Sequence, residues 1–207
     1  MSHLSHMHQR LLPCLLLAAL PLLADALLPA SAQVTGPAKA PAEAPLRGPA
    51  RLDKLFEKLK TAESPQAAQV AASDIERAFE RSGSPTADLI YSRVKEAMSA
   101  KDFDLALDLL DYLVALRPDW AEPYHRRSVV HFLRKDQDAA FRDVRETLAR
   151  EPRHYHALAG LGAMLGMMGD AKGAFRAYQK ALEIHPFFSD LKESVEKMRP
   201  DVEGRPI

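Results

Sequence analysis

Residues 155–188 read YHALAGLGAMLGMMGDAKGAFRAYQKALEIHPFF. Apolar residues recur at helical spacing on both sides of the Gly169-Asp170 break, which predicts two amphipathic helices joined by a short turn. Pro186 closes the stretch, because proline disfavours helix in the residue before it. The stretch is therefore interpreted as a helix hairpin.

The same layout recurs at a period of 34 residues. The recurring positions hold proline, aspartate and alanine: Pro118, Pro152 and Pro186; Asp102, Asp136 and Asp170; and Ala106, Ala140 and Ala174. Three residue types that share one spacing define three units, 87–120, 121–154 and 155–188.

Each recurring residue has a physical role in a helix pair. The aspartate is placed to cap the second helix, because its carboxylate can accept a hydrogen bond from a free backbone N–H. The alanine lets two helices approach closely. The proline closes the unit, since it cannot continue a helix.

The third unit resembles a tetratricopeptide repeat (TPR). The residues that carry the resemblance are Leu158, Leu161, Gly162, Leu165, Ala174, Phe175, Tyr178, Ala181 and Pro186, together with the Gly169-Asp170 turn. The resemblance implies an all-α solenoid of stacked hairpins that binds another protein. The first two units depart from the family pattern at Arg93, Arg127, His131 and Thr147, where polar side chains replace apolar or small ones.

Helical sequence also precedes the three units. Residues 51–86 carry two apolar stripes, the second of which follows a helix start signal at Ser64-Pro65. They lie one period upstream and are interpreted as a degenerate fourth hairpin that extends the solenoid.

A capping helix is expected after the repeats, over residues 189–200. Ser189 is placed to cap this helix, and Pro200 is expected to end it. Repeat arrays need such a terminal helix, because the last repeat otherwise exposes its apolar face. Residues 201–207 are interpreted as a tail.

The first 32 residues are predicted to be a secretory signal peptide. Arg10 precedes an apolar stretch over residues 11–24, and the small residues Ala30-Ser31-Ala32 follow, which favours cleavage after Ala32. An uncleaved membrane anchor is the alternative, although the stretch is short for a spanning helix. The expected location is therefore periplasmic or secreted, without stable membrane insertion after cleavage.

Residues 33–50 are rich in Ala and Pro, a composition typical of an extended, solvated linker. A Pro-rich ligand for another protein is the alternative interpretation. Cys14 is the sole cysteine, so a chain cleaved after Ala32 would have no thiol for disulfides or catalysis.

Charge and side-chain patterns disfavour several functions. The 28 basic and 28 acidic side chains balance, whereas nucleic-acid binding requires clustered positive charge. Gly160, Gly162 and Gly166 do not match a nucleotide-binding fingerprint. No nucleophile and base pair stands out, so the chain is not expected to be an enzyme. No cofactor or metal is expected either, because the methionines around Met164 and the dispersed histidines lack ligand spacing.

The resemblance implies that a partner peptide lies on the concave face that the first helices form. The family's groove positions correspond here to Tyr91, Lys95, Met98, His125, Val129, Phe132, Leu133 and Met167. The clamp with which some TPR proteins hold a chaperone's terminal carboxylate is absent from these positions. Burial of Phe132 and Leu133 under neighbouring repeats is the alternative interpretation.

The sequence thus predicts an exported TPR scaffold or adaptor that binds a protein or peptide in the periplasm or cell envelope. A metal-handling accessory protein that uses Met and His, and an uncharacterised envelope enzyme, are the alternative functions.

If the leader is cleaved as predicted, the native protein isolated from cells begins at Gln33. N-terminal sequencing of that protein measures this directly. Retention of Met1 would contradict the prediction and favour the uncleaved anchor.

Overall fold

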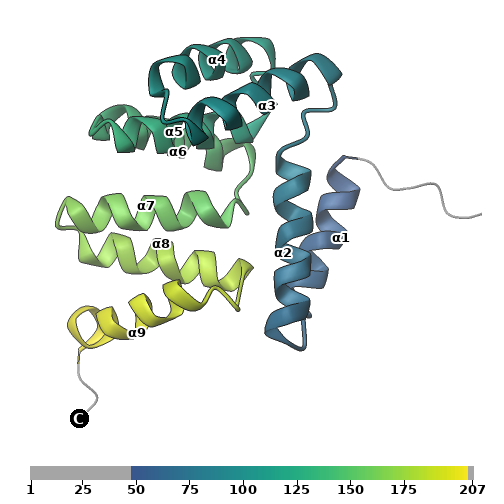
Figure 1. The fold of residues 1–207 in the computed structure, drawn as a ribbon. Coiled ribbons are helices and arrows are strands. Elements are labelled where there is room, and N and C mark those ends of the chain that lie inside the picture. The colour runs from purple at the N-terminus through teal and green to yellow at the C-terminus, as the bar shows by residue number, and fades with distance from the viewer. Residues whose placement is uncertain (1–47, 205–207) are drawn as a thin grey trace, which may run out of the picture. The chain divides into compact units, whose positions relative to one another are not determined.

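The computed structural model describes residues 48–204. The predicted signal peptide, almost all of the linker and the last three residues of the tail lie outside this range. Nine α-helices occupy the described residues (Figure 1): α1 Pro49–Lys60, α2 Pro65–Phe79, α3 Pro85–Ser99, α4 Phe103–Leu116, α5 Ala121–Leu133, α6 Gln137–Arg150, α7 Tyr155–Met167, α8 Ala171–Ile184 and α9 Ser189–Glu203.

Six of these helices form the three expected hairpins. Helix α3 packs on α4, α5 on α6, and α7 on α8, and each hairpin then contacts the next through α4 and α5 or α6 and α7. The described residues contain helices and no strands, which confirms the all-α prediction. The recurring alanines Ala106, Ala140 and Ala174 are fully buried, as close approach of paired helices requires.

The recurring aspartates cap the second helices as predicted. Asp102 accepts a hydrogen bond from the backbone N–H of Leu105 at 3.2 Å, and Asp170 accepts from Gly173 at 2.8 Å. Asp136 does the same for the N–H of Ala139 at 3.0 Å. Each cap satisfies one of the backbone donors that a helix start leaves free.

The turn before each aspartate also repeats. Lys101, Lys135 and Gly169, which are 34 residues apart, all have left-handed backbone, with φ of 58°, 65° and 84°. This conformation returns the next N–H to the end of the first helix, as from Asp170 to the carbonyl of Leu165 at 2.9 Å. Glycine adopts this left-handed conformation without strain, whereas at each lysine the conformation costs about 1–2 kcal/mol of folding free energy.

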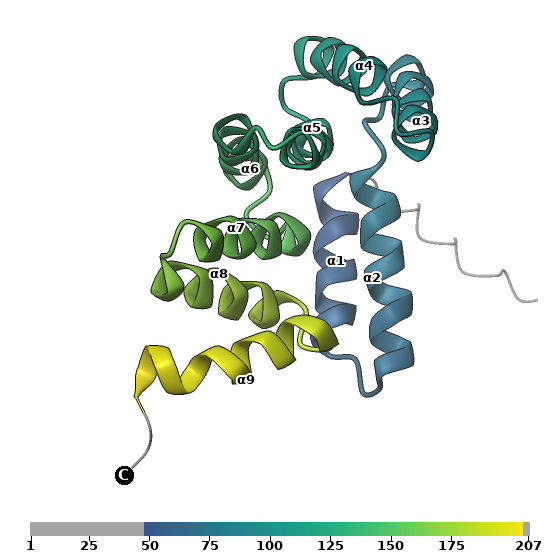
Figure 2. The ribbon, with the colours of Figure 1, turned by 60° about the vertical axis from the view of Figure 1, so that its left-hand side comes forward.

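The hairpin α1–α2 does not extend the solenoid as expected. Helix α2 makes few contacts with α3, and the hairpin instead joins a core with α7, α8 and α9. The shared core contains Leu55, Phe56, Leu59, Ala68, Ala71, Ala72, Ile75 and Phe79 with Tyr155, Leu158, Ala181 and Leu191. Figures 1 and 2 show α1 and α2 lying across the ends of α7 and α8 at a steep angle.

A short link between α2 and α3 redirects the chain. Gly83 in this link has φ of 77°, a conformation that side chains other than glycine rarely adopt. The link is held from the first repeat, since Arg117 donates to the carbonyl of Ser82 at 2.6 Å. The indole N–H of Trp120 donates to the carbonyl of Phe79 at 2.7 Å. These bonds fix the folded-back position of α2.

Helix α9 covers α8 with Leu191 and Val195 but differs from the prediction at both ends. Phe188 occupies the cap position instead of Ser189, whose hydroxyl donates to Asp190. The helix also continues through Pro200 to Glu203. Pro200 is exposed, so water can satisfy the carbonyl that the missing N–H would have bonded. Within residues 48–204 no helix has the length and apolar character needed to cross a membrane.

Two glycines of α7 provide a matched test of the packing. A Cβ at Gly162 would lie 2.4–2.5 Å from the ring of Tyr178, whereas one at Gly160 meets no heavy atom within 4 Å. We expect Gly162→Ala to lower the free energy of unfolding by about 1–3 kcal/mol through overpacking. Gly160→Ala should raise it by up to about 1 kcal/mol through helix propensity. Urea denaturation measures both, and equal midpoints would contradict the packing of α7 on α8.

Candidate functional site

A buried carboxylate lies where three repeats meet. Glu122, near the start of α5, is only 2% exposed. Its Oε1 accepts hydrogen bonds from the hydroxyl of Tyr91 at 2.8 Å and from Nε of Arg126 at 2.6 Å. Its Oε2 lies 3.1 Å from Nε2 of His154. The partners come from α3, from α5 and from the residue that caps α7.

The contacts of His154 define its tautomer. Nδ1 accepts from the backbone N–H of Ala157 at 3.2 Å, so the proton is on Nε2, which donates to Glu122. The imidazole ring also stacks on Phe79 of α2, with centroids 4.5 Å apart and planes inclined by 7°. The side chain of His154 thus caps α7, donates to the buried carboxylate of Glu122 and packs against the end of α2.

Protonation in this network follows its hydrogen bonds. Burial alone would raise the pKa of Glu122, but the hydrogen bond from His154 and the neighbouring charges outweigh it, and the pKa lies well below its usual range. Burial, and then the charge of Glu122, raises the pKa of Tyr91. The carboxylate therefore stays ionised while the phenol stays protonated and donates.

The network reaches α2 through two ion pairs at its edge. Arg126 lies 3.6 Å from a carboxylate oxygen of Glu80, the residue after α2. Lys95 of α3 donates to the other oxygen of Glu80 at 2.9 Å. Lys95 was predicted to face a partner, and in this structure it joins the first repeat to the hairpin.

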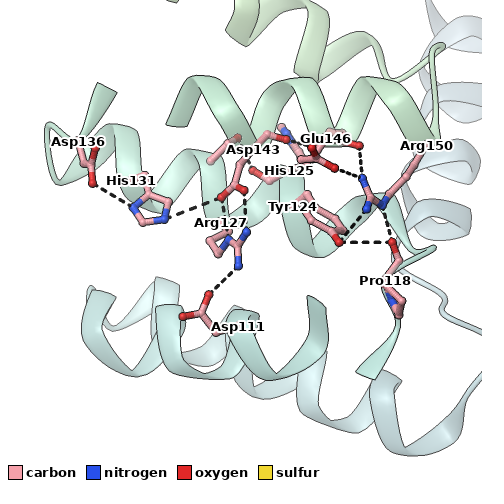
Figure 3. A network of polar contacts seen from close by, with 12 residues as sticks. Asp111, Pro118, Tyr124, His125, Arg127, His131, Asp136, Asp143, Glu146 and Arg150 are labelled. Atoms are coloured by element: carbon pink, nitrogen blue, oxygen red, sulfur yellow. Dashed lines mark hydrogen bonds and ion pairs between the residues drawn. The ribbon is translucent and has the colours of Figure 1, made fainter. Parts of the chain in front are cut away.

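A second polar network joins the first two repeats at Arg127 (Figure 3). Its guanidinium makes two hydrogen bonds of 2.7 Å to Asp143 of α6 and one of 2.7 Å to Asp111 of α4. His131 lies 3.8 Å from Asp143 and 3.9 Å from Asp136. A charged cluster thus occupies the place where the TPR pattern has large apolar residues.

Two adjoining cavities open between the first helices of the second and third repeats. The apolar cavity, of about 150 Å³, is lined by His125, Ser128, Val129, Phe132, Leu133, Val144, His156, Ala157, Gly160, Ala163 and Met164. The polar cavity, of about 440 Å³, is lined by Glu76, Phe79, Glu122, His125, Arg126, Val129, His154 and His156. They share His125, Val129 and His156 and together form the α5–α7 groove, with α2 as its wall at the polar end.

Four of the eight predicted groove residues line this groove. His125, Val129, Phe132 and Leu133 line the apolar cavity. Met167 is exposed at the end of α7 and lines neither cavity. Phe132 also packs against the core of Ala140, Val144 and Met164, so it is both a groove and a core residue.

The residues predicted on α3 are placed differently. Tyr91 is 1% exposed and bound to Glu122, which corrects its assignment to an accessible groove. Met98 is half-buried against the core of the first repeat, and Lys95 is paired with Glu80. Each of these three side chains is taken up by a contact within the chain rather than left free to face a bound peptide.

Sequence reasoning missed the part of the site that α2 supplies. Glu76 of α2 is 3.1 Å from Nε2 of His156 and accepts from the hydroxyl of Tyr155 at 3.2 Å. No 34-residue counterpart of Glu76 marks it as a site residue. Gly160 was also not predicted as a site residue, although two glycines and their small neighbours on α7 indicate open space beside that helix.

Two histidines each have a buried ring nitrogen without a hydrogen-bond partner among the described residues. Nδ1 of His125 and Nδ1 of His185 are both enclosed without a bond. The ring of His125 is 4.3 Å from that of His154, and the ring of His185 is 5.1 Å from that of Tyr155. Burial, and then neighbouring histidines, lowers the pKa of both groups. Both are therefore neutral at neutral pH.

Despite these histidines, residues 48–204 hold no group of three or more His, Cys, Asp or Glu side chains arranged to bind a metal ion. The imidazoles here pack on aromatic rings or bond to single carboxylates.

No protein-family model matches the chain. A TPR repeat-containing protein of Rhizobium etli is 33% identical over 154 residues, which cover 74% of this chain and 76% of that protein. A heat-shock cognate co-chaperone of Aspergillus fumigatus is 28% identical over 140 residues, which cover 65% of this chain and 40% of the co-chaperone. The chain therefore matches about two fifths of that relative's length.

The solved structure of the first TPR of Spaghetti bound to an HSP90 peptide is similar in fold. It superposes with a TM-score of 0.53 at 17% identity, over 56% of this chain and 93% of that chain. This likeness, together with the Rhizobium relative, confirms the predicted solenoid of helix hairpins.

The two buried neutral histidines predict acid sensitivity. Histidine in the unfolded chain titrates near pH 6.5, above the lowered pKa of His125 and His185 in the fold. The unfolded state therefore binds more protons as pH falls below about 6.5, and the free energy of unfolding decreases by up to about 1.4 kcal/mol per pH unit per histidine.

We expect His185→Phe to flatten this pH dependence between pH 5 and 7, because phenylalanine fills the same aromatic site without titrating. Urea denaturation at several pH values measures the slope. A slope equal to that of the wild type would show that His185 is not held neutral by the fold.

Proposed function

Because the chain belongs to the tetratricopeptide-repeat family, we propose that it is a non-enzymatic scaffold that binds a short peptide segment of a partner protein in the α5–α7 groove. The apolar cavity carries this proposal. It provides an unfilled apolar site on the face formed by first helices, beside polar groups that can orient a ligand. A few apolar anchors with polar groups around them are typical of protein-binding surfaces.

The shape of the groove supports a single apolar anchor. Val129 and Phe132 on α5 face Ala163 and Met164 on α7, and the absence of a side chain at Gly160 leaves space between the helices. A cavity of about 150 Å³ is comparable to the volume of one large aliphatic or aromatic side chain. We therefore infer that the ligand inserts one apolar residue here.

The polar end of the groove supports a hydrogen bond next to this anchor. Nδ1 of His125 has no bond within the described chain, and the ring lines both cavities. Because Nδ1 itself is enclosed, a ligand at this end would meet the rest of the His125 ring and the charged side chains of Glu76 and Arg126, which line the polar cavity.

The relatives support peptide binding as the class of function. The similar Aspergillus protein is a co-chaperone, and the similar Spaghetti structure holds an HSP90 peptide. The ligand itself is not carried over. Here Tyr91 and Lys95 are bound within the chain, and the third repeat has Ala163 and Met167 at its groove positions.

Export to the periplasm or cell envelope is the second part of the proposal. Its support is the N-terminal sequence: Arg10, the apolar residues 11–24 and Ala30-Ser31-Ala32. The linker over residues 33–50 would then separate the repeats from the cleavage site.

Filling the groove tests the proposal without removing a packed side chain. Gly160→Leu places a side chain in the apolar cavity, and the site has no neighbouring heavy atom within 4 Å of the new Cβ. Peptides selected from a random library on the wild-type protein should contain an apolar anchor. They should bind Gly160→Leu at least about tenfold more weakly, a difference of about 1.4 kcal/mol.

Fluorescence anisotropy measures the affinities, and circular dichroism confirms that the variant is helical. Val70→Lys is the matched control, since Val70 is exposed on α2 away from the groove lining and should leave the affinity unchanged. Equal binding to wild-type protein and Gly160→Leu would place the binding site on another face.

A further inference from the structure

The polar end of the α5–α7 groove contains a carboxylate with one open oxygen. Glu76 lies on the folded-back helix α2, and its side chain is 44% exposed. Both of its hydrogen bonds end on Oε1, which lies 3.2 Å from the hydroxyl of Tyr155 and 3.1 Å from Nε2 of His156. Among residues 48–204 no group donates to Oε2, so this oxygen is available to a ligand.

The charge of Glu76 is not balanced by a cation within the described chain. Its neighbour Glu122 pairs with Arg126 at 2.6 Å, and Glu80 pairs with Lys95 at 2.9 Å. Arg126 also lies 3.6 Å from Glu80. These three carboxylates therefore share two cations, and the donors to Glu76 are a phenol and an imidazole rather than a lysine or arginine. Glu76 is the carboxylate in excess.

The polar cavity as a whole carries the same excess of negative charge. Its lining holds the two carboxylates of Glu76 and Glu122 and the single guanidinium of Arg126. Burial, and then the charge of His154, lowers the pKa of His125, which is therefore neutral. His154 is neutral as well, because its Nδ1 accepts a hydrogen bond. The cavity thus favours a positively charged ligand group.

His156 connects this carboxylate to the apolar cavity. Its ring lines both cavities, and its Nε2 contacts Oε1 of Glu76. One imidazole ring and one hydrogen bond therefore separate Glu76 from the site of the apolar anchor. An extended peptide advances about 3.3–3.6 Å per residue, so a side chain within about two residues of the anchor reaches the carboxylate.

We propose that Glu76 makes the groove selective for peptides that carry a lysine or arginine within about two residues of the apolar anchor. This inference rests on the proposed peptide binding in the α5–α7 groove and adds the charge of the partner segment. The cation bonds to Oε2 of Glu76, while Tyr155 and His156 hold the carboxylate in place through Oε1. Hydrogen bonds between two charged groups are stronger than those between neutral groups.

The same charges disfavour an acidic residue beside the anchor. A ligand carboxylate in the polar cavity would lie next to Glu76 without a cation to pair with. Arg126 could bind it only by giving up its bond to Glu122, which is buried and would be left with fewer donors. Selectivity therefore comes from repulsion of acidic peptides as well as from attraction of basic ones.

Peptide affinities test the proposal on protein expressed from the full reading frame and purified in the form that cells retain. Peptides selected on it from a random library should carry a lysine or arginine within about two residues of an apolar anchor. The selected peptides are then made in N-acetylated form, so that only side chains supply positive charge. Peptides that lack a basic residue at this spacing would overturn the proposal.

Replacing that basic residue in the peptide measures its contribution. At about pH 8, where histidine side chains are in general neutral, fluorescence anisotropy gives the affinities. Glutamine in place of the lysine or arginine should weaken binding to the wild-type protein about fivefold, as expected for a partly exposed ion pair. Glutamate at the same position should weaken binding further.

Glu76→Gln tests whether this carboxylate is the partner of the cation. Glutamine keeps an oxygen that can accept from Tyr155, and circular dichroism checks that the variant is helical. The basic peptide and its glutamine version should bind this variant with nearly equal affinity. Asp74→Asn is the matched control, because Asp74 lies on the same helix, pairs with Arg77 and lines neither cavity. It should retain the preference of about fivefold.

Salt provides a readout that requires no variant. Raising the ionic strength from about 0.05 to 0.5 M should weaken wild-type binding of the basic peptide more than that of the glutamine version. If Gly160→Leu abolishes binding but the preference for a basic residue is absent, or survives in Glu76→Gln, the inference is wrong and the groove remains the peptide site. Equal binding to wild-type protein and Gly160→Leu would instead contradict the proposed function itself.

Discussion

The ionised carboxylate of Glu122 is the constraint on which the arrangement of the repeats depends. A buried charge is strongly destabilising unless several donors surround it. Its donors come from the first repeat through Tyr91, from its own helix through Arg126, and from the residue that caps the third repeat's first helix, His154. A shift of one repeat against another would remove a donor and leave the charge unpaired. The network therefore selects one register of the three hairpins.

The network also decides where the N-terminal hairpin lies. One face of the His154 imidazole stacks on Phe79, and the guanidinium of Arg126 forms an ion pair with Glu80. The end of α2 is thus attached to the polar centre, and its apolar side covers α7, α8 and α9. This one packing arrangement has two consequences. It closes the polar end of the α5–α7 groove, and it leaves the first repeat without a preceding repeat.

Polar contacts between repeats replace part of the apolar packing that the family pattern suggests. Arg127 and Asp143 form a nearly enclosed pair with two parallel hydrogen bonds, a geometry that guanidinium and carboxylate groups match well. Such pairs contribute less net stability than apolar side chains of similar size, because both charges lose water. Their directionality, however, restricts how one hairpin can be placed on the next.

The sequence by itself determined the hairpins, their caps and their turns, because these depend on residues close together in the chain. The 34-residue period located the capping aspartates, and Asp102, Asp136 and Asp170 all cap their helices. It also indicated the α5–α7 groove through Val129 and Phe132, since a repeating backbone places equivalent residues on one face. Only the tertiary structure decided that Tyr91 is buried, that Glu76 forms part of the site, and that the hairpin folds back. Those outcomes depend on contacts between residues 31 to about 80 positions apart. Local periodicity carries no information about such contacts, because an amphipathic helix specifies that its apolar face is covered but not which helix covers it.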